Sequence, residues 1–310
     1  MANWTELDVP DLSGRAVLVT GANSGLGLRT AWVLAGRRAR VLLACRSLDR
    51  GAAAAAAIGG TAELVQLDLA DLDSVRRAAA EVRERTDDKL DVLINNAGVM
   101  FLPHERTPQG FERQFGTNHL GHAALTWLLM PALRNRPGAR VVTLSSLWAR
   151  FGRIHVPDPN FESRRYSANA AYAQSKLANL LFALELDRHA KASGLDLISV
   201  AAHPGYTATS LNTNSANSWP GLLGRTLNTV YGFGDRLIGQ PVERGVLPTL
   251  YAATAPGVVG GEYYGPDGLG EVHGRHPRRV TPPKQALDPV LASKLWIRTA
   301  ELTGVASDPA

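Results

Sequence analysis

The chain has 310 residues, of which 45% are hydrophobic and 20% are charged. This composition is that of a globular protein and excludes a chain that is disordered over most of its length. The formal net charge of +5 comes mainly from scattered arginines, with one tight basic cluster at residues 275–279. No basic stripe with interleaved aromatic residues accompanies the charge, so we expect no nucleic-acid partner and a phosphate-bearing cofactor as the bound anion.

Cysteine content and apolar segments indicate the compartment. Cys45 is the single cysteine, which excludes an intrachain disulfide and is compatible with a reducing compartment. Residues 1–8 show no basic leader followed by an apolar region. The longest apolar stretch, residues 123–133, is too short to span a bilayer. We therefore expect a cytoplasmic protein without a membrane anchor.

Short apolar runs alternate with longer amphipathic stretches from residue 15 to about residue 200. This alternation is typical of repeated βαβ units and predicts an α/β fold with a doubly wound parallel sheet, the Rossmann fold. No internal repeat or linker divides the chain, so we expect one domain over residues 1–310. The alanine run at 52–57 and the segment 71–85 are predicted helices. The predicted strands are 16–20, 40–44, 62–67, 90–95, 139–145 and 196–201.

Segments 147–171 and 206–240 interrupt the alternation. Long irregular segments in compact folds are often binding loops, and 206–240 combines glycines with isolated aromatic residues. We expect 206–240 to be an inserted lid over the substrate. Near the end of the chain, Asp288-Pro289 is a good N-cap and first-turn pair, which predicts a terminal helix over 289–302.

A glycine-rich turn, Gly21-x-x-x-Gly25-x-Gly27, lies between the first apolar run and a helical pattern. In that context the missing side chains let the backbone approach a pyrophosphate, and the following helix N-terminus favours negative charge. The spacing differs from Gly-x-Gly-x-x-Gly, and a glycine-rich hairpin or cap is the alternative interpretation.

Arg46 occupies the position at which this kind of site distinguishes NAD from NADP. NAD-selective sites carry an acid about 20 residues after the glycines, to bind the ribose hydroxyls. Here no acid occurs between Gly27 and Asp49. Arg46 can instead pair with a 2′-phosphate, so we expect NADP(H) to be preferred, with NAD(H) possible. An ordinary exposed arginine at a strand end is the alternative.

Tyr172-Ala-Gln-Ser-Lys176 places a phenol and an ammonium on one helix face. A free tyrosine titrates near pH 10, and a nearby cation favours the phenolate. Lys176 is therefore expected to tune Tyr172 for proton exchange with an alcohol or carbonyl. Tyr-x-x-x-Lys alone is a common coincidence, but here it follows a nucleotide-binding turn.

Further motifs follow the glycine-rich turn along the chain. In order, the motifs are Thr20-Gly-Ala-Asn-Ser-Gly-Leu-Gly27, Asp68-Leu69, Asn95-Asn-Ala-Gly98, Asn118-His-Leu-Gly-His122, Ser145-Ser146, Tyr172-x-x-x-Lys176 and Pro204-Gly205. In content and order they resemble those of the classical short-chain dehydrogenases/reductases over about residues 12–305. More narrowly, Leu43-Ala-Cys-Arg46, Tyr172-x-x-Ser-Lys-Leu-Ala-Asn179 and His203-Pro-Gly205 resemble the retinol-dehydrogenase-like branch. The membrane anchor of animal members of that branch has no counterpart here.

The resemblance implies a catalytic set. Tyr172 is the proton donor or acceptor, and Ser146, the second serine of its pair, holds the substrate oxygen. Lys176 binds the nicotinamide ribose and favours the tyrosinate, while Asn118 completes a water-linked proton relay to Lys176. The long spacing from Ser146 to Tyr172 matches a branch with an insertion before the tyrosine helix.

The resemblance also implies a cofactor site. Gly21, Ser24, Gly25, Leu26 and Gly27 contact the pyrophosphate side. Arg46 and Ser47 bind the 2′-phosphate, and Asp68 with Leu69 binds the adenine. The remaining cofactor residues are Asn95, Ala97, Gly98, Tyr172, Lys176, Pro204, Gly205, Thr207 and Thr209, of which Thr209 aligns with the usual nicotinamide-amide threonine.

Structural interpretations of these residues stay open beside the functional ones. Asn95 and Asn96 can satisfy backbone groups at a strand end, Asn118 can bond within its helix, and serines can end a strand. His119 and His122 are predicted to be buried hydrogen-bonding residues rather than a metal pair, because no third ligand accompanies them. We expect no metal site.

The predicted function is NADP(H)-dependent interconversion of a lipophilic alcohol and its ketone or aldehyde. A light-dependent protochlorophyllide reductase is one alternative, but that family carries a cysteine where this chain has Ala178. A non-catalytic NADP-sensing or scaffold protein is another, although Ser146, Tyr172 and Lys176 are all present. The expected partner is a small-molecule substrate, and a homo-oligomer is possible.

Overall fold

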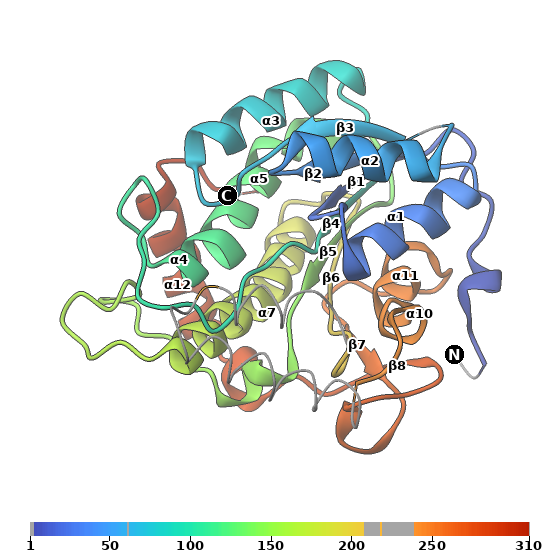
Figure 1. The fold of residues 1–310 in the computed structure, drawn as a ribbon. Helices are drawn as coiled ribbons and strands as arrows, with labels where there is room; N and C mark the ends of the chain where they lie inside the picture. The colour runs from blue at the N-terminus through green and yellow to red at the C-terminus, as the bar shows by residue number, and fades with distance from the viewer. Residues whose placement is uncertain (1–2, 61, 208–217, 219–238, 310) are drawn as a thin grey trace.

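The computed structural model describes residues 3–60, 62–207, 218 and 239–309, and its strands form one sheet with helices on both faces (Figure 1). The strand order is β3-β2-β1-β4-β5-β6-β7-β8. All neighbours pair in parallel except β8, which runs antiparallel to β7. The strands are β1 Ala16–Thr20, β2 Arg40–Cys45, β3 Ala62–Gln66, β4 Val92–Asn95, β5 Ala139–Leu144, β6 Leu197–Ala202, β7 Tyr263–Pro266 and β8 Pro277–Arg279.

Alternate residues of the buried strands face opposite helix layers, as the period of a β-strand requires. Val17 and Val19 of β1 belong to one apolar core, and Leu18 belongs to the other. One core includes helices α1 Gly25–Gly36, α2 Leu48–Ile58 and α11 Leu247–Thr254, and the short helix α10 Val242–Gly245 lies beside α1. The other layer holds α3 Leu72–Arg85, α4 Arg113–Phe115, α5 Gly121–Leu128, α6 Met130–Arg134, α7 Ala168–Ala192 and α12 Pro289–Thr303.

The structure confirms the predicted Rossmann fold and most of its elements. The six predicted strands correspond to β1–β6. The terminal helix is α12, where Asp288 Oδ1 accepts hydrogen bonds from the amides of Val290 (2.9 Å) and Leu291 (3.1 Å). Sequence reasoning missed β7 and β8. No helix within the described ranges is both long and apolar enough to cross a membrane.

Most of the predicted lid lies outside the described residues. Within 206–240, only Tyr206, Thr207, Ser218, Gly239 and Gln240 are described. Thr207 and Gln240 form a parallel bridge, and the Gln240 amide donates to the Tyr206 carbonyl at 3.0 Å. Both ends of the segment are therefore tied together, while the lid itself stays a prediction.

Candidate active site

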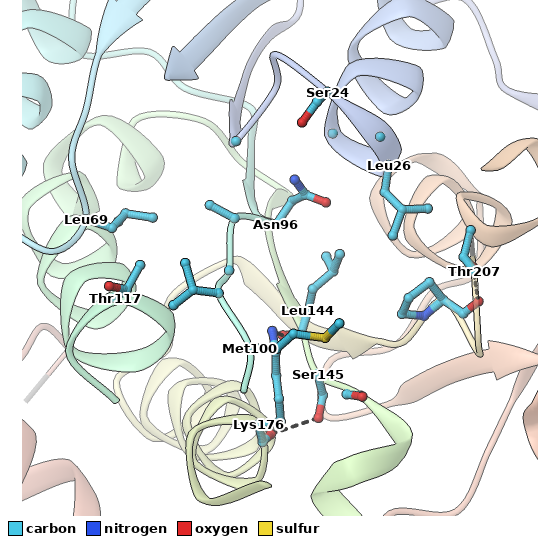
Figure 2. A pocket seen from close by; sticks show the side chains of 18 of the residues that line it. Ser24, Leu26, Leu69, Asn96, Met100, Thr117, Leu144, Ser145, Lys176 and Thr207 are labelled. Carbon is cyan, nitrogen blue, oxygen red and sulfur yellow. Dashed lines mark hydrogen bonds between the residues drawn. The ribbon is translucent and has the colours of Figure 1, made fainter. Parts of the chain in front are cut away.

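A cavity of about 450 Å³ opens beyond the carboxyl ends of the central parallel strands, where doubly wound sheets bind their ligands. In Figure 2, Ser24 and Leu26 lie at one end and Lys176 and Ser145 at the other. The predicted site residues that line it are Gly21, Ser24, Gly25, Leu26, Gly27, Arg46, Asp68, Leu69, Ala97, Gly98, Ser146, Tyr172, Lys176, Pro204, Gly205 and Thr207.

The glycine-rich turn fits a bound pyrophosphate. Gly21 and Gly25 have positive φ angles of 66° and 53°, which glycine adopts without strain. A Cβ at Gly27 would lie 2.4 Å from the Gly21 carbonyl oxygen, so glycine is required for α1 to begin this close to β1. The N-terminus of α1 faces the cavity and favours a negative group there. These residues therefore fit the dinucleotide that the sequence predicts.

Two exposed cations, Arg46 and Arg50, line the cavity beside Asp68 and Leu69. Among the described residues, neither guanidinium forms an ion pair with an acid. Arg50 was not predicted; it lies in the first turn of α2, which follows β2. Ser47, predicted to bind the phosphate, is instead the N-cap of α2, where its Oγ accepts from the Arg50 amide at 3.4 Å, and it does not line the cavity.

Asn95 does not reach the cavity, which corrects its predicted cofactor role. Its side chain is fully buried and donates to Thr126 Oγ1 at 3.0 Å and Thr143 Oγ1 at 3.4 Å. Asn96 lines the cavity instead, and its Nδ2 donates to the Thr20 carbonyl at 2.7 Å. The alternation of side chains along a strand is the signal that separates these two residues.

Tyr172 and Lys176 lie one turn apart in α7 and are both buried. Lys176 Nζ lies 6.0 Å from the centre of the Tyr172 ring and donates to the Leu144 carbonyl at 3.2 Å. Burial raises the pKa of Tyr172 to about 12, against the opposing effect of a hydrogen bond with Ser146. Burial also lowers the pKa of Lys176 to about 8. Burial is thus the largest effect on the pKa of Tyr172 in this structure. The tuning of Tyr172 by Lys176 stays a prediction.

The two serines after β5 face different groups. Ser145 Oγ donates to the Lys176 carbonyl at 2.8 Å and so holds α7 against the sheet (Figure 2). Ser146 hydrogen-bonds Tyr172 and accepts from the Trp148 amide at 3.3 Å as the N-cap of the 3₁₀ helix Leu147–Phe151. Ser146 is therefore the serine whose hydroxyl lies beside the Tyr172 phenol.

Asn118 lies in a π-helical segment, Gly116–Leu120, and its side chain is occupied by protein groups. Oδ1 accepts from the Val99 amide at 2.8 Å, and Nδ2 donates to the Val99 carbonyl and to Ser175 Oγ, both at 2.9 Å. It does not line the cavity and forms no bond to Lys176. Asn118 therefore fixes the loop after β4. Its water-linked relay to Lys176 stays a prediction.

His119 and His122 are buried hydrogen-bonding residues, as predicted. His119 Nε2 contacts Thr299 Oγ1 at 2.9 Å. His122 Nδ1 lies 2.8 Å from the Asn118 carbonyl, so Nδ1 carries the proton and Nε2 accepts from Thr20 Oγ1 at 2.9 Å. Burial lowers the pKa of His119 to about 3 and that of His122 to about 4. Within the described residues, no group of three side chains is placed to hold a metal.

The turn after β6 lines the remaining side of the cavity. Gly205 has a φ of 69°, and a Cβ there would lie 2.4 Å from the Val272 carbonyl oxygen. Thr207 Oγ1 donates to the Pro204 carbonyl at 2.9 Å, which closes the turn. Thr209, the predicted nicotinamide-amide residue, lies outside the described residues.

Aromatic residues surround Tyr172 at the mouth of the site. The Phe101 ring lies edge-on to the rings of Tyr172 and Trp148, with both centroid distances 5.0 Å. Phe101, Trp148 and Met100 all line the cavity. Phe101 was not predicted, because only the fold brings the loop after β4 against α7.

Comparison with known proteins identifies the family. Residues 15–219 match the model of the short chain dehydrogenase family. The chain belongs to this family. It is 39% identical to human retinol dehydrogenase 13 over 95% of this chain and 86% of that protein. It is 46% identical to human retinol dehydrogenase 11 over 66% and 65% of the respective chains. A solved structure from Mycobacterium paratuberculosis is 42% identical and covers 98% of both chains with a TM-score of 0.81.

These relatives place the chain in the retinol-dehydrogenase-like branch of the short-chain dehydrogenases/reductases. Family membership makes it an oxidoreductase that acts on CH–OH groups with a nicotinamide dinucleotide and a small-molecule substrate.

Proposed function

We propose that this enzyme interconverts a lipophilic alcohol and its ketone or aldehyde with NADP(H), and that Tyr172 is its general acid/base. One observation carries the proposal: the glycine-rich turn, two arginines and the Ser146–Tyr172–Lys176 group all line one cavity. The turn supplies a cradle for the pyrophosphate at one end. The phenol, hydroxyl and ammonium meet at the other, where a carbonyl oxygen can be bound and protonated.

The high pKa of Tyr172 has a direct chemical consequence. A phenol with a pKa of about 12 is protonated at neutral pH, so Tyr172 is ready to donate a proton to a carbonyl oxygen during reduction. Ser146, which hydrogen-bonds the phenol, is placed to share the same oxygen. The bound nicotinamide supplies the hydride in reduction and accepts it in oxidation.

Lys176 has two proposed roles. With a pKa of about 8, its ammonium is the dominant form at neutral pH. It would stabilise the negative charge that Tyr172 carries after proton donation, and it would hold the nicotinamide ribose. Asn118 acts indirectly in this proposal. Its bonds to Val99 fix the backbone beside Gly98, where a Cβ would lie 3.4 Å from Lys176 Nζ.

Preference for NADP(H) rests on the charges at the adenosine end. Arg46 and Arg50 contribute two cations to the cavity wall, and Asp68 is the acid among the lining residues. Asp68 Oδ1 accepts from the Ala70 amide at 3.0 Å, which ties the carboxylate to its own turn. A 2′-phosphate beside two guanidinium groups gains charge-assisted hydrogen bonds that a ribose hydroxyl does not.

The proposal of a lipophilic substrate rests on the lining at the catalytic end. Met100, Phe101, Trp148 and Leu144 present apolar surface beside Tyr172. Apolar walls with a few convergent polar groups are typical of small-molecule sites. A cytoplasmic location, consistent with the single cysteine, and a homo-oligomeric state complete the proposal.

The test is a screen of lipophilic ketones, aldehydes and secondary alcohols against NADPH, NADH and their oxidised forms. Absorbance at the nicotinamide band reports turnover. We expect NADPH-dependent reduction of at least one bulky carbonyl, and a lower kcat/KM with NADH. NADPH binding without turnover of any compound in the screen would favour the sensor alternative.

A further inference from the structure

Outside the catalytic group, one buried carboxylate links two segments that line the cavity. Glu271 lies in the loop between β7 and β8, and its side chain is 12% exposed. Its Oε2 lies 3.0 Å from His203 Nε2 and 2.7 Å from Arg150 Nη2. Glu271 adopts a φ of 62°, a conformation that side-chain-bearing residues seldom take. The contacts to both partners account for a glutamate at this backbone position.

His203 connects Glu271 to the turn that lines the cavity. Its ring is fully buried, and its Nδ1 accepts from the Gly205 amide at 3.2 Å. Since Nδ1 is an acceptor, Nε2 carries the proton and donates to Glu271. The Tyr206 amide also donates to the Val272 carbonyl at 2.6 Å, directly beside Glu271. The position of the Pro204–Gly205 turn therefore depends on this loop.

Arg150 connects Glu271 to the serine beside Tyr172. It lies in the 3₁₀ helix Leu147–Phe151, whose N-cap is Ser146. The ion pair thus holds the C-terminal part of this short helix, and Ser146 caps its N-terminus. The Arg150 side chain is 42% exposed, and Glu271 is the acid with which it pairs among the described residues.

We propose that Glu271 is a positioning residue, which sets the placement of Ser146 through Arg150 and of the Pro204–Gly205 turn through His203. This inference rests on the proposed function, because the two groups that it aligns are those beside the substrate oxygen and the cofactor. Glu271 itself does not line the cavity. Its effect is on geometry, and small misplacements of reacting groups are costly in rate.

The chain offers a matched control. Arg279 of β8 pairs with Glu262 at 2.9 Å, and the side-chain exposures of the pair are 66% and 16%. In both this pair and the Arg150–Glu271 pair, an arginine that is largely open to solvent contacts a mostly buried glutamate. Neither Arg279 nor Glu262 lines the cavity. Arg279→Met therefore removes a comparable ion pair without touching the proposed alignment.

The experiment compares Glu271→Gln, Arg150→Met, Arg150→Lys and Arg279→Met in the full chain. Steady-state kinetics gives kcat and KM, NADPH fluorescence titration gives its Kd, and thermal melting checks that each variant is folded. We expect Glu271→Gln and Arg150→Met to lower kcat by about 10- to 100-fold, with the substrate KM changing less. Arg150→Lys should recover part of the loss, and Arg279→Met should match the parent.

A double variant and the cofactor titration sharpen the outcome. Arg150→Met combined with Glu271→Gln should lose no more kcat than the worse single variant, because both remove one link. Glu271→Gln should also weaken NADPH binding, since the Pro204–Gly205 turn lines the cofactor cavity. Unchanged kcat in folded Arg150→Met, unchanged Kd for NADPH in folded Glu271→Gln, or an equal loss in Arg279→Met would overturn the inference. If the parent turns over no carbonyl, the proposed function fails, and the NADPH titration still decides the role of Glu271.

Discussion

At the scale of single residues, burial shifts the pKa values of both ionisable groups in the proposed catalytic set. It raises the pKa of Tyr172 and lowers that of Lys176. The sequence predicted these two residues and the glycine-rich turn, because the chemistry of each requires particular residue types at a fixed short spacing. Asn95 and Asn96 show the limit of such patterns. These two polar residues stand side by side after an apolar run, so the sequence alone does not distinguish them. The structure shows that Asn95, the last residue of β4, is buried, and that Asn96 lines the cavity.

Cofactor selectivity is also set by single residues. Arg46→Ala should weaken NADPH binding by about 10- to 100-fold, because a charge-assisted contact to phosphate is lost. Arg50→Ala should act in the same direction, and NADH binding should hardly change in either variant. Calorimetric titration with both cofactors measures this, with Lys294→Ala, an exposed position of α12, as the surface control. Equal losses for NADPH and NADH would contradict a 2′-phosphate contact.

At the scale of elements, β1–β6 were predictable because each is a short apolar run that a helical pattern follows. The strands β7 and β8 were not. β7 contains Gly265 and Pro266, and β8 is Pro277-Arg278-Arg279, with both arginines exposed. Such residues are poor indicators of strands, and β8 pairs only with β7, at the edge of the sheet. Tertiary pairing, not local propensity, makes them strands.

Within α5, the buried side chain of His122 makes the stability of the protein depend on pH. The pKa of His122 falls from 6.5 to about 4 on folding, because the ring is buried neutral. The unfolded chain therefore binds more protons, and stability is lost as the pH falls from about 6.5 towards 4. His122→Gln, which cannot be protonated there, should reduce this loss while lowering stability at pH 7.5. Thermal melting across this range provides the measurement, with His104→Gln at an exposed position as the control. Identical pH slopes for the parent and His122→Gln would refute the prediction.

At the scale of the whole molecule, helices on both faces bury the sheet, and the last helix completes one of these layers (Figure 1). Trp296 of α12 stacks on His189 at 4.6 Å and on Phe182 at 5.4 Å, and meets the Trp127 ring edge-on at 4.9 Å. The end of the chain therefore packs against α7, which carries Tyr172 and Lys176. The sequence predicted α12 from its cap, but not this contact, because it joins residues that are distant along the chain.

This packing predicts a large cost for truncating Trp296. Trp296→Ala should lower the free energy of unfolding by about 3 to 5 kcal/mol, the usual range for removing a large buried aromatic side chain. Ile297→Ala, at a 56% exposed position of the same helix, should change it by less than about 0.5 kcal/mol. Urea unfolding followed by circular dichroism compares the two. Similar losses for both variants would show that α12 does not support the core through Trp296.

The central claim is that one cavity binds NADPH and presents the Tyr172 proton to a carbonyl. The most direct test is Tyr172→Phe, with kcat measured on the best carbonyl of the screen and NADPH affinity measured on the same preparation. We predict that kcat falls by about 10²- to 10⁴-fold, the usual contribution of a general acid, while the Kd for NADPH stays unchanged. Turnover within about threefold of the parent, with the Kd unaltered, would contradict the role of Tyr172 as the proton donor.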